Sequence, residues 1–333
     1  MTTTADRILL GHGSGGKLMH DLIREVMVRE FGGRGKLLDS AILKFPSQNL
    51  AFTTDSYVVR PLFFPGGDIG KLAVSGTIND LSVVGARPLF LSCGLIIEEG
   101  LEMSVLQKVI RSMQRTAQKA GVRIVTGDTK VVEKGSCDGL FVNTAGVGYA
   151  ERFFDEEIRV GDEIVVSGTV GDHGMAILAA REDFGLETTL RSDCAPLNGL
   201  VQTLKPCFSK IRLMRDPTRG GLATVLNEFV EGTNHGILLD EERIPTKKAV
   251  RALSELLGLD PLYVANEGRV VIVCAEGTGE KLVSLMRKHP LGKQSVVIGK
   301  VVTDYPGKLC MTTQAGGTRI LDMLVSDQLP RIC

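Results

Sequence analysis

The sequence has 333 residues, 43% of them hydrophobic and 23% charged, which is typical of a globular protein large enough for two domains. Its 39 basic and 39 acidic residues give a formal net charge of zero, so we expect neither nucleic acid nor an anionic membrane as a partner. Residues 1–10 contain no apolar run of signal-peptide length, and the longest apolar stretches have the length of strands. The seven cysteines form no CxxC pair, and several lie in apolar runs. We therefore expect a cytoplasmic protein with reduced thiols and no structural zinc.

Strand-like and helix-like segments alternate along the chain, which predicts an α/β fold. In the first half we expect helices at 17–31, 69–85 and 102–120, and strands at 51–59, 88–97, 123–126 and 140–149. A charged, turn-rich stretch at 150–162 separates a second set, with strands at 163–167, 269–275 and 296–302 and helices at 174–181, 220–231, 247–257 and 279–288. These segments predict two α/β domains, 1–154 and 155–315, followed by a mobile tail at 316–333.

A glycine-rich segment near the start, GHGSGGK at 11–17, is the first candidate binding element. Gly13, Gly15 and Gly16 free the backbone N–H groups to face an anion, and Lys17 adds a positive charge. Leu18 follows where a P-loop places the hydroxyl that holds Mg²⁺, which disfavours a true P-loop. A flexible turn is the plain alternative; we favour a mobile loop that closes over a nucleotide.

Three aspartates stand in contexts that normally bury their side chains. Asp55 lies in an apolar strand, Asp80 follows Asn79 in an apolar helix, and Asp128 lies where a predicted strand ends, two residues before Lys130. One such carboxylate is usually a cap or part of a turn, but three in one domain favour a cation that gathers them, because unpaired buried charge is costly. Mg²⁺ prefers such oxygen ligands together with nucleotide phosphates, to which Lys130 could add a charge.

In the second domain, RDPTRGG at 215–221 precedes a predicted helix. Asp216 starts a turn with the following proline, Thr218 could cap the helix, and the glycine pair frees N–H groups at its start. The segment fits an anion site and a plain capped loop equally well.

Four motifs occur in order along most of the chain: TTDS (53–56), NDLSVVGARP (79–88), TGDTKVV (126–132) and DPTRGG (216–221). Together they resemble the family that includes aminoimidazole ribonucleotide synthetase, thiamine monophosphate kinase, selenophosphate synthetase and the hydrogenase maturation factors. The resemblance implies an N-terminal domain that closes a β-barrel across a homodimer, with MgATP bound between the acidic motifs and the glycine-rich loop.

Carried over by motif, the family's Mg²⁺ ligands would be Asp55, Asp80 and Asp128, while Asn79 and Lys130 would contact the phosphates. Thr126, Gly127, Asp216 and Thr218 belong to the same motifs and are further candidates for nucleotide binding. Selenophosphate synthetases need a reactive cysteine or selenocysteine in the N-terminal loop. The first cysteine here is Cys93, which disfavours that branch of the family.

The sequence ends in PRIC, and Cys333 is its last residue. A Pro-Arg-Ile-Cys tail and the segment ANEGR (265–269) resemble the HypE branch of the hydrogenase maturation factors. That resemblance implies that a carbamoyltransferase, HypF, loads a carbamoyl group onto Cys333, and that ATP drives its dehydration to a thiocyanate. The nitrile would then pass through a HypC–HypD iron scaffold to the iron of a [NiFe]-hydrogenase.

For the base that removes the amide protons we nominate Glu267, although a structural role before Gly268 is nearly as plausible. His12, in the glycine-rich segment, is a weaker candidate, and we interpret His173 and His235 as structural. Two other functions stay open: a small-molecule kinase of the same fold, similar to thiamine monophosphate kinase, and a nucleotide-binding scaffold without turnover.

Overall fold

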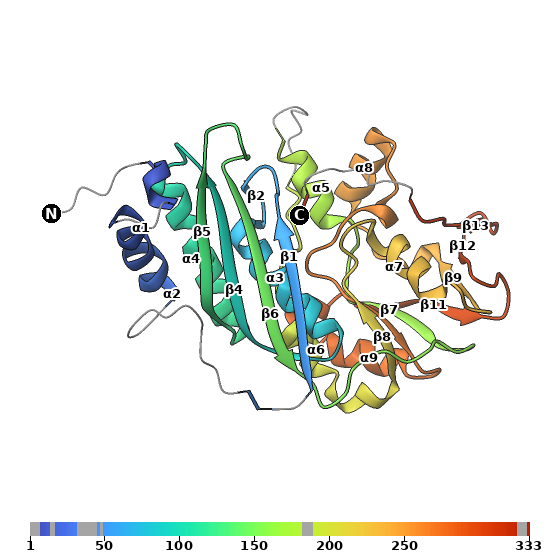
Figure 1. The fold of residues 1–333 in the computed structure, drawn as a ribbon. Coiled ribbons are helices and arrows are strands. Elements are labelled where there is room, and N and C mark those ends of the chain that lie inside the picture. The colour runs from blue at the N-terminus through green and yellow to red at the C-terminus, as the bar shows by residue number, and fades with distance from the viewer. Residues whose placement is uncertain (1–6, 14–16, 32–44, 47–48, 182–188, 325–331) are drawn as a thin grey trace.

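The computed structural model describes residues 7–13, 17–31, 45–46, 49–181, 189–324 and 332–333. It contains two α/β units built on separate sheets, joined by residues 150–162 (Figure 1). The two-domain α/β fold expected from the sequence is therefore confirmed.

The first sheet has four strands in the order β1-β6-β4-β5. Their bounds are Leu50–Tyr57 for β1, Arg87–Glu98 for β4, Arg123–Val132 for β5 and Leu140–Tyr149 for β6. All neighbours pair antiparallel except β4 and β5, which are parallel. Among the described residues this sheet stays open, with β1 and β5 as its edges, and a short hairpin of β2 (Phe63–Phe64) and β3 (Gly67–Asp68) stands beside it.

Helices cover one face of this sheet, which we call the inner face. Here α3 (Ile69–Val83) packs on β1, β4 and β6, and α4 (Met103–Ala120) lies beside α3 and β5. Because α3 also contacts α6 and β8 of the second unit, it is buried nearly all round, which explains why its sequence has no continuous polar face. The other face of the sheet is the outer face.

The N-terminal segment lies at the β5 side of the sheet. The 3₁₀ turn η1 (Leu10–Gly13) contacts β5, and α1 (Lys17–Leu22), the π-helical η2 (Ile23–Val28) and α2 (Arg29–Phe31) follow it toward α4. The helix expected at 17–31 is thus present, with π-helical geometry in its middle.

The second sheet has seven strands in the order β13-β12-β9-β11-β7-β10-β8. Their bounds are Glu163–Val166 (β7), Ile211–Arg215 (β8), Gly236–Asp240 (β9), Val271–Cys274 (β10), Val296–Val302 (β11), Leu309–Thr312 (β12) and Thr318–Ile320 (β13). Residues of β7 and β10 alternate between two separate apolar clusters, one on each face. Burial on both faces explains why these strands read as continuous apolar runs.

Helices supply the apolar partners of both faces. One cluster includes α7 (Gly221–Val230), and the other includes α6 (Asn198–Thr203) and α9 (Gly279–Met286). Toward the first unit lie α5 (Asp172–Ala179) and α8 (Lys248–Leu257), whose side chains join the core of that unit. The remaining 3₁₀ turns are η4 (Lys205–Lys210), η5 (Glu241–Arg243), η6 (Pro261–Tyr263) and η7 (Pro290–Gly292).

Every strand and helix expected from the sequence is present within a few residues, except that β5 continues to Val132 instead of ending at Thr126. Six short strands (β2, β3, β8, β9, β12 and β13) and α6 were not expected. Since β13 pairs with β12 and Leu321 is fully buried, the first residues of the predicted 316–333 tail belong to the second sheet. Residues 325–331 lie outside the described part of the chain.

In the described part of the chain, no helix combines the length and apolar character that crossing a bilayer requires.

Candidate functional site

Four carboxyl side chains from both units form one acidic cluster, made of Asp55, Asp80, Asp216 and Glu267. Asp55 lies on β1, Asp80 on α3, Asp216 directly after β8, and Glu267 shortly before β10. Their mutual influence appears in their titration, since each of the last three feels Asp55 as a nearby negative charge. The cluster therefore marks the junction of the two units.

Burial is the main cause of the perturbed acidity in this cluster. It raises the pKa of Asp80 to about 6, with Asp55 adding to the rise and a hydrogen bond from Thr53 Oγ1 (2.9 Å) opposing it. Burial, followed by the charge of Asp80, raises the pKa of Asp216 to about 7. Burial also raises the pKa of Glu267, which is 2% exposed, well above its usual range, with Asp216 as the next cause.

Little positive charge balances these groups. Arg219 approaches Asp55 at 3.9 Å but is 68% exposed, and Asp216 Oδ2 is buried without a hydrogen-bond partner. Crowded carboxyls with an orphaned oxygen fit a site that receives a cation. In the described residues, however, no three His, Cys, Asp or Glu side chains are placed to hold a metal ion by themselves. Mg²⁺ fits such a site only with phosphate oxygens completing its shell, as is usual for this ion.

Asp128 does not join the cluster, which corrects the expectation that three aspartates of one chain meet. In the register, Asp55 pairs with Thr144 on the inner face, whereas Asp128 pairs with Gly94 on the outer face. β1 and β5 are also three strands apart, a distance of about 14 Å. Lys130 accompanies Asp128 on the outer face, with Nζ 3.4 Å from its Oδ2.

Asn79 is occupied with structural bonds, so its predicted contact with phosphates is not available in this arrangement. The side chain is fully buried; Nδ2 donates to the carbonyl oxygens of Ala195 (3.2 Å) and Glu267 (3.3 Å), and Oδ1 accepts from Leu197 N (2.7 Å). Asn79 thereby ties α3 to the loop that carries Glu267.

The described residues of the glycine-rich segment, 11–13 and 17, lie at the far side of the sheet. Gly13 ends η1 beside β5 and Lys17 begins α1, while Gly15 and Gly16 lie outside the described residues. His12, the weaker candidate base, is 4% exposed, and its Nδ1 lies 3.0 Å from Leu9 N, so it is a buried histidine of a turn.

Gly127 and Thr218 were two further candidates for nucleotide binding. Gly127, next to Thr126 on exposed β5, leaves no room for a side chain, since a Cβ would clash with the carbonyl oxygen of Cys93; strand packing alone explains this glycine. Thr218 does not cap α7, because the N-cap is Gly220 in left-handed geometry (φ 69°) without a side-chain bond.

The end of the chain is seated close to this cluster. Ile332 is 3% exposed in the apolar core, and its carbonyl oxygen lies 2.6 Å from His173 Nε2. Val58, three residues after Asp55 along the chain, donates its N–H to a carboxylate oxygen of Cys333 (3.3 Å). Cys333 itself is half-buried against the same core.

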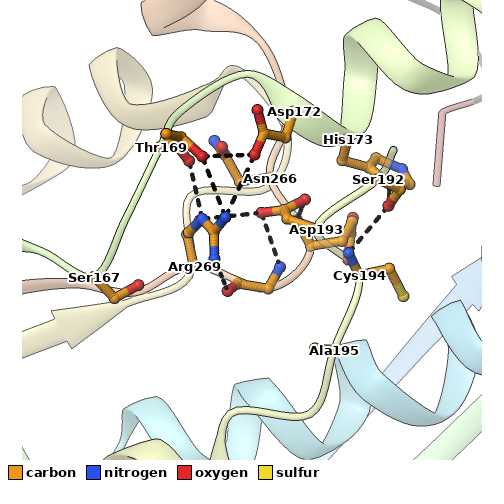
Figure 2. A network of polar contacts seen from close by, with 12 residues as sticks. Ser167, Thr169, Asp172, His173, Ser192, Asp193, Cys194, Ala195, Asn266 and Arg269 are labelled. Atoms are coloured by element: carbon orange, nitrogen blue, oxygen red, sulfur yellow. Dashed lines mark hydrogen bonds and ion pairs between the residues drawn. The ribbon is translucent and has the colours of Figure 1, made fainter. Parts of the chain in front are cut away.

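A polar network connects this seat with the Glu267 loop (Figure 2). Asp193 accepts from the backbone N–H groups of Glu267 (3.1 Å) and Gly268 (3.3 Å) and lies 3.7 Å from Arg269 Nε. Arg269 in turn bonds Asp172, whose Oδ2 is also 2.7 Å from Lys247 Nζ. The network fixes the backbone on which Glu267 stands.

Sequence reasoning missed most of these second-domain residues. It interprets His173 as structural, includes Arg269 only as part of the ANEGR segment, and does not single out Ser192 or Asp193. No local pattern marks residues 189–197, because apolar residues in this loop recur with neither the period of a strand (2) nor that of a helix (3.6). The one usable signal is Asp193-Cys194 inside a Ser-, Pro- and Ala-containing loop, which is too common to interpret.

Comparison with known proteins identifies the family of both domains. Residues 38–150 match the N-terminal domain, and residues 159–309 the C-terminal domain, of AIR synthase related proteins. The carbamoyl dehydratase HypE of Rhodobacter capsulatus is 48% identical over 340 residues, covering 100% of both chains. The crystal structure of a hydrogenase maturation protein HypE in complex with ATP has 45% identity and a TM-score of 0.93, covering 98% of this chain and 99% of that one.

A HypE–HypF complex contains a similar chain, with 44% identity and a TM-score of 0.79 over 91% of this chain and 99% of that one. The thiamine monophosphate kinase of Aquifex aeolicus, at 19% identity and a TM-score of 0.58, shares the fold alone. Identity of this extent over the full length, together with both domain matches, places the sequence in one branch: the chain belongs to the HypE family of carbamoyl dehydratases.

Proposed function

We propose that the chain uses ATP to dehydrate a carbamoyl group carried on the sulfur of Cys333, giving a thiocyanate for the cyanide ligands of a [NiFe]-hydrogenase. The observation that carries the proposal is the seat of the chain end, where Ile332 is buried and Cys333 lies beside Val58, at the end of the strand that bears Asp55. Because the cargo is tethered to the chain, its delivery to the acidic junction would need no separate binding step.

The chemistry requires that a poor leaving group be converted into a good one. The amide oxygen attacks the γ-phosphorus of ATP and ADP leaves; loss of the two nitrogen protons and of phosphate then gives S–C≡N. Glu267 is our base: its burial raises its pKa well above the ordinary range, so it holds a proton more strongly than an exposed carboxylate does.

We propose that ATP phosphates bind at the acidic cluster together with Mg²⁺. Asp55, Asp80 and Asp216 would hold the ion, which supplies positive charge to the phosphates. The orphaned Asp216 Oδ2 and the scarcity of balancing cations support this assignment. Asp216 thus takes the place of Asp128 among the Mg²⁺ ligands that we propose for one chain.

A homodimer would give a role to the motif residues that lie away from the acidic cluster. Asp128, Lys130, Thr126 and the glycine-rich segment gather at the β5 edge, whereas the acidic cluster lies at the β1 edge. If the outer faces of two open sheets close a barrel, as we propose, the β5 edge of one subunit can complete the site of the other. Exposed Phe52 and Ile96 on the outer face support such a contact.

For partners, we propose HypF as the source of the carbamoyl group and a HypC–HypD complex as the recipient of the nitrile. The HypE–HypF complex of a 44% identical chain supports the first.

The decisive experiment is intact-protein mass spectrometry after incubation with a carbamoyl donor system and ATP. We expect the wild-type protein to gain the carbamoyl mass and then lose the mass of water, and Cys333→Ala to show neither step while still binding ATP. Cys137→Ala is the matched control, because Cys137 is the other thiol that is not buried. An adduct formed and dehydrated on Cys333→Ala would refute the proposal, and ATP binding without any adduct on the wild-type protein would favour a scaffold.

A further inference from the structure

We propose that His173, oriented by Ser192, is a positioning residue that latches the docked end of the chain by its main chain. The proposal deepens the function above, because a docked end is what presents the cargo on Cys333. The latch itself can be tested without that chemistry.

The hydrogen-bond pattern assigns the donors. A carbonyl oxygen only accepts, so the 2.6 Å contact requires that His173 Nε2 carry the hydrogen it donates to Ile332. Nδ1 must then accept, and Ser192 Oγ lies 2.8 Å from it. Ser192 Oγ already accepts from Cys194 N (3.0 Å), which leaves its own hydrogen for His173. The chain Cys194–Ser192–His173–Ile332 is thus complete in donors and acceptors (Figure 2 shows its first three members).

The surroundings hold the ring in this state. His173 is fully buried, and burial lowers its pKa, which favours the neutral ring that both bonds require. The edge of Phe64 meets the ring at 84° with centroids 5.6 Å apart, which fixes its plane. Asp193 is the charged group whose field acts on His173, and it opposes the effect of burial.

The contacts described for the chain end involve its backbone and the side chains of Ile332 and Cys333. Ile332 offers its carbonyl to His173, Cys333 offers a carboxylate oxygen to Val58, and both side chains pack against the apolar core.

Carboxypeptidase digestion of the 333-residue chain measures this docking directly. The peptide bond that is cut, between Ile332 and Cys333, contains the carbonyl that His173 holds, so cleavage requires release of the end and its rate follows the released fraction. In His173→Phe, which keeps a ring but has no donor, we expect Cys333 to be lost about tenfold faster than in the wild type. A factor of this size corresponds to the net contribution of one buried hydrogen bond. In Ser192→Ala we expect an increase of about threefold, and in His173→Gln, which retains a donor, a rate within about twofold of the wild type.

His289→Phe is the matched control, since His289 bonds only its own turn through Leu291 N (3.3 Å) among the contacts described, and we expect no change. Circular dichroism verifies that each variant is folded; if His173→Phe is not, Ser192→Ala decides. Wild-type release rates in the folded variants, or equal acceleration in His289→Phe, would overturn the latch. Altered release rates with no adduct on the wild-type protein would instead leave the latch standing and refute the proposed function.

Discussion

At the scale of single residues, Glu267 stands out because it is nearly inaccessible and surrounded by other carboxyls, with Asp216 as the strongest and then Asp193, Asp55 and Asp80. Such surroundings disfavour the charged form and so increase its affinity for a proton. A purely structural role for Glu267, as a residue that merely precedes Gly268, does not require a buried carboxyl.

We therefore predict that Glu267→Gln accumulates the carbamoylated, undehydrated protein, with dehydration slowed by about 10²- to 10⁴-fold. In the wild type the single-turnover rate should rise with pH, because the base must lose its proton first, and the rise should occur above the ordinary range of a glutamate. Intact-mass time courses at several pH values measure both effects. Glu228→Gln, an exposed change on α7, is the control, and normal conversion by Glu267→Gln would exclude this base.

Asp216 gives a prediction about stability and pH. In the folded chain its pKa is about 7, against 3.8 as the ordinary value, so the folded state binds the proton more tightly than the unfolded state does. The resulting stabilisation is complete below pH 3.8 and is lost as the pH rises through 7.

Asp216→Asn should consequently raise the free energy of unfolding at pH 8, by at most about 4 kcal/mol, and change it little at pH 4. Urea unfolding without nucleotide or Mg²⁺, at both pH values, measures this difference. The wild-type protein unfolded under the same conditions is the reference. A loss of stability at pH 8 in Asp216→Asn would contradict the prediction.

At the scale of elements, α3 joins the two units through Asn79. Removing that amide leaves the Ala195 carbonyl oxygen and the Leu197 N–H without the bonds that Asn79 makes in a buried position, while the Glu267 carbonyl oxygen keeps only the Ala195 N–H (3.2 Å). We expect Asn79→Ala to lower the free energy of unfolding by about 2 to 4 kcal/mol. Asn143→Ala removes a similar number of bonds from an exposed position and should cost less than half as much. Denaturant titration compares the two, and equal losses would argue against the clamp.

The elements also indicate how far the sequence could be interpreted. Periodicity located α4 and β6 within one residue, because an amphipathic helix and a strand between two faces each leave a repeating pattern. It failed for β5, which was expected to end at Thr126. The exposed TGDTK segment lacks the apolar signal of a strand, yet pairing with β4 carries it on to Val132.

The longer β5 also determines where Asp128 lies. Within the strand its side is fixed by alternation, so Asp128 lies on the outer face, three strands away from Asp55 in the sheet order. Its role as a Mg²⁺ ligand stays a prediction. By contrast, Asp55 and Asp80 were named from their unusual contexts, Asp216 from its turn motif and Glu267 as a candidate base, and the structure brings all four together. Asp193 and Ser192 could not be named, because their partners are distant in sequence.

At the scale of the whole molecule, the two edges of the first sheet carry different halves of the motif set. If two subunits share each site, one subunit contributes Asp55 and the other contributes Asp128. Asp55→Asn and Asp128→Asn then remove different contributions, and a chain that carries one of the changes still has the other aspartate. Both variants alone should be inactive in ADP formation.

Mixing them after unfolding and refolding should restore about a quarter of wild-type activity, because half of the dimers are mixed and each of these has one intact site. Refolding each variant with itself is the control and should restore nothing. No recovery in the mixture, with dimers demonstrated by light scattering, would mean that both aspartates serve the same chain.

The crowding of acids at the junction has a consequence for the whole reaction cycle. Near neutral pH, Asp80, Asp216 and Glu267 together hold protons that ordinary carboxyls would already have released. Arrival of a metal–nucleotide complex would lower their affinity for those protons and expel some of them into solvent, and after the products depart the carboxyls would bind protons again. Binding heats should then vary with the ionisation enthalpy of the buffer, so each cycle of the enzyme would also be a cycle of proton uptake and release.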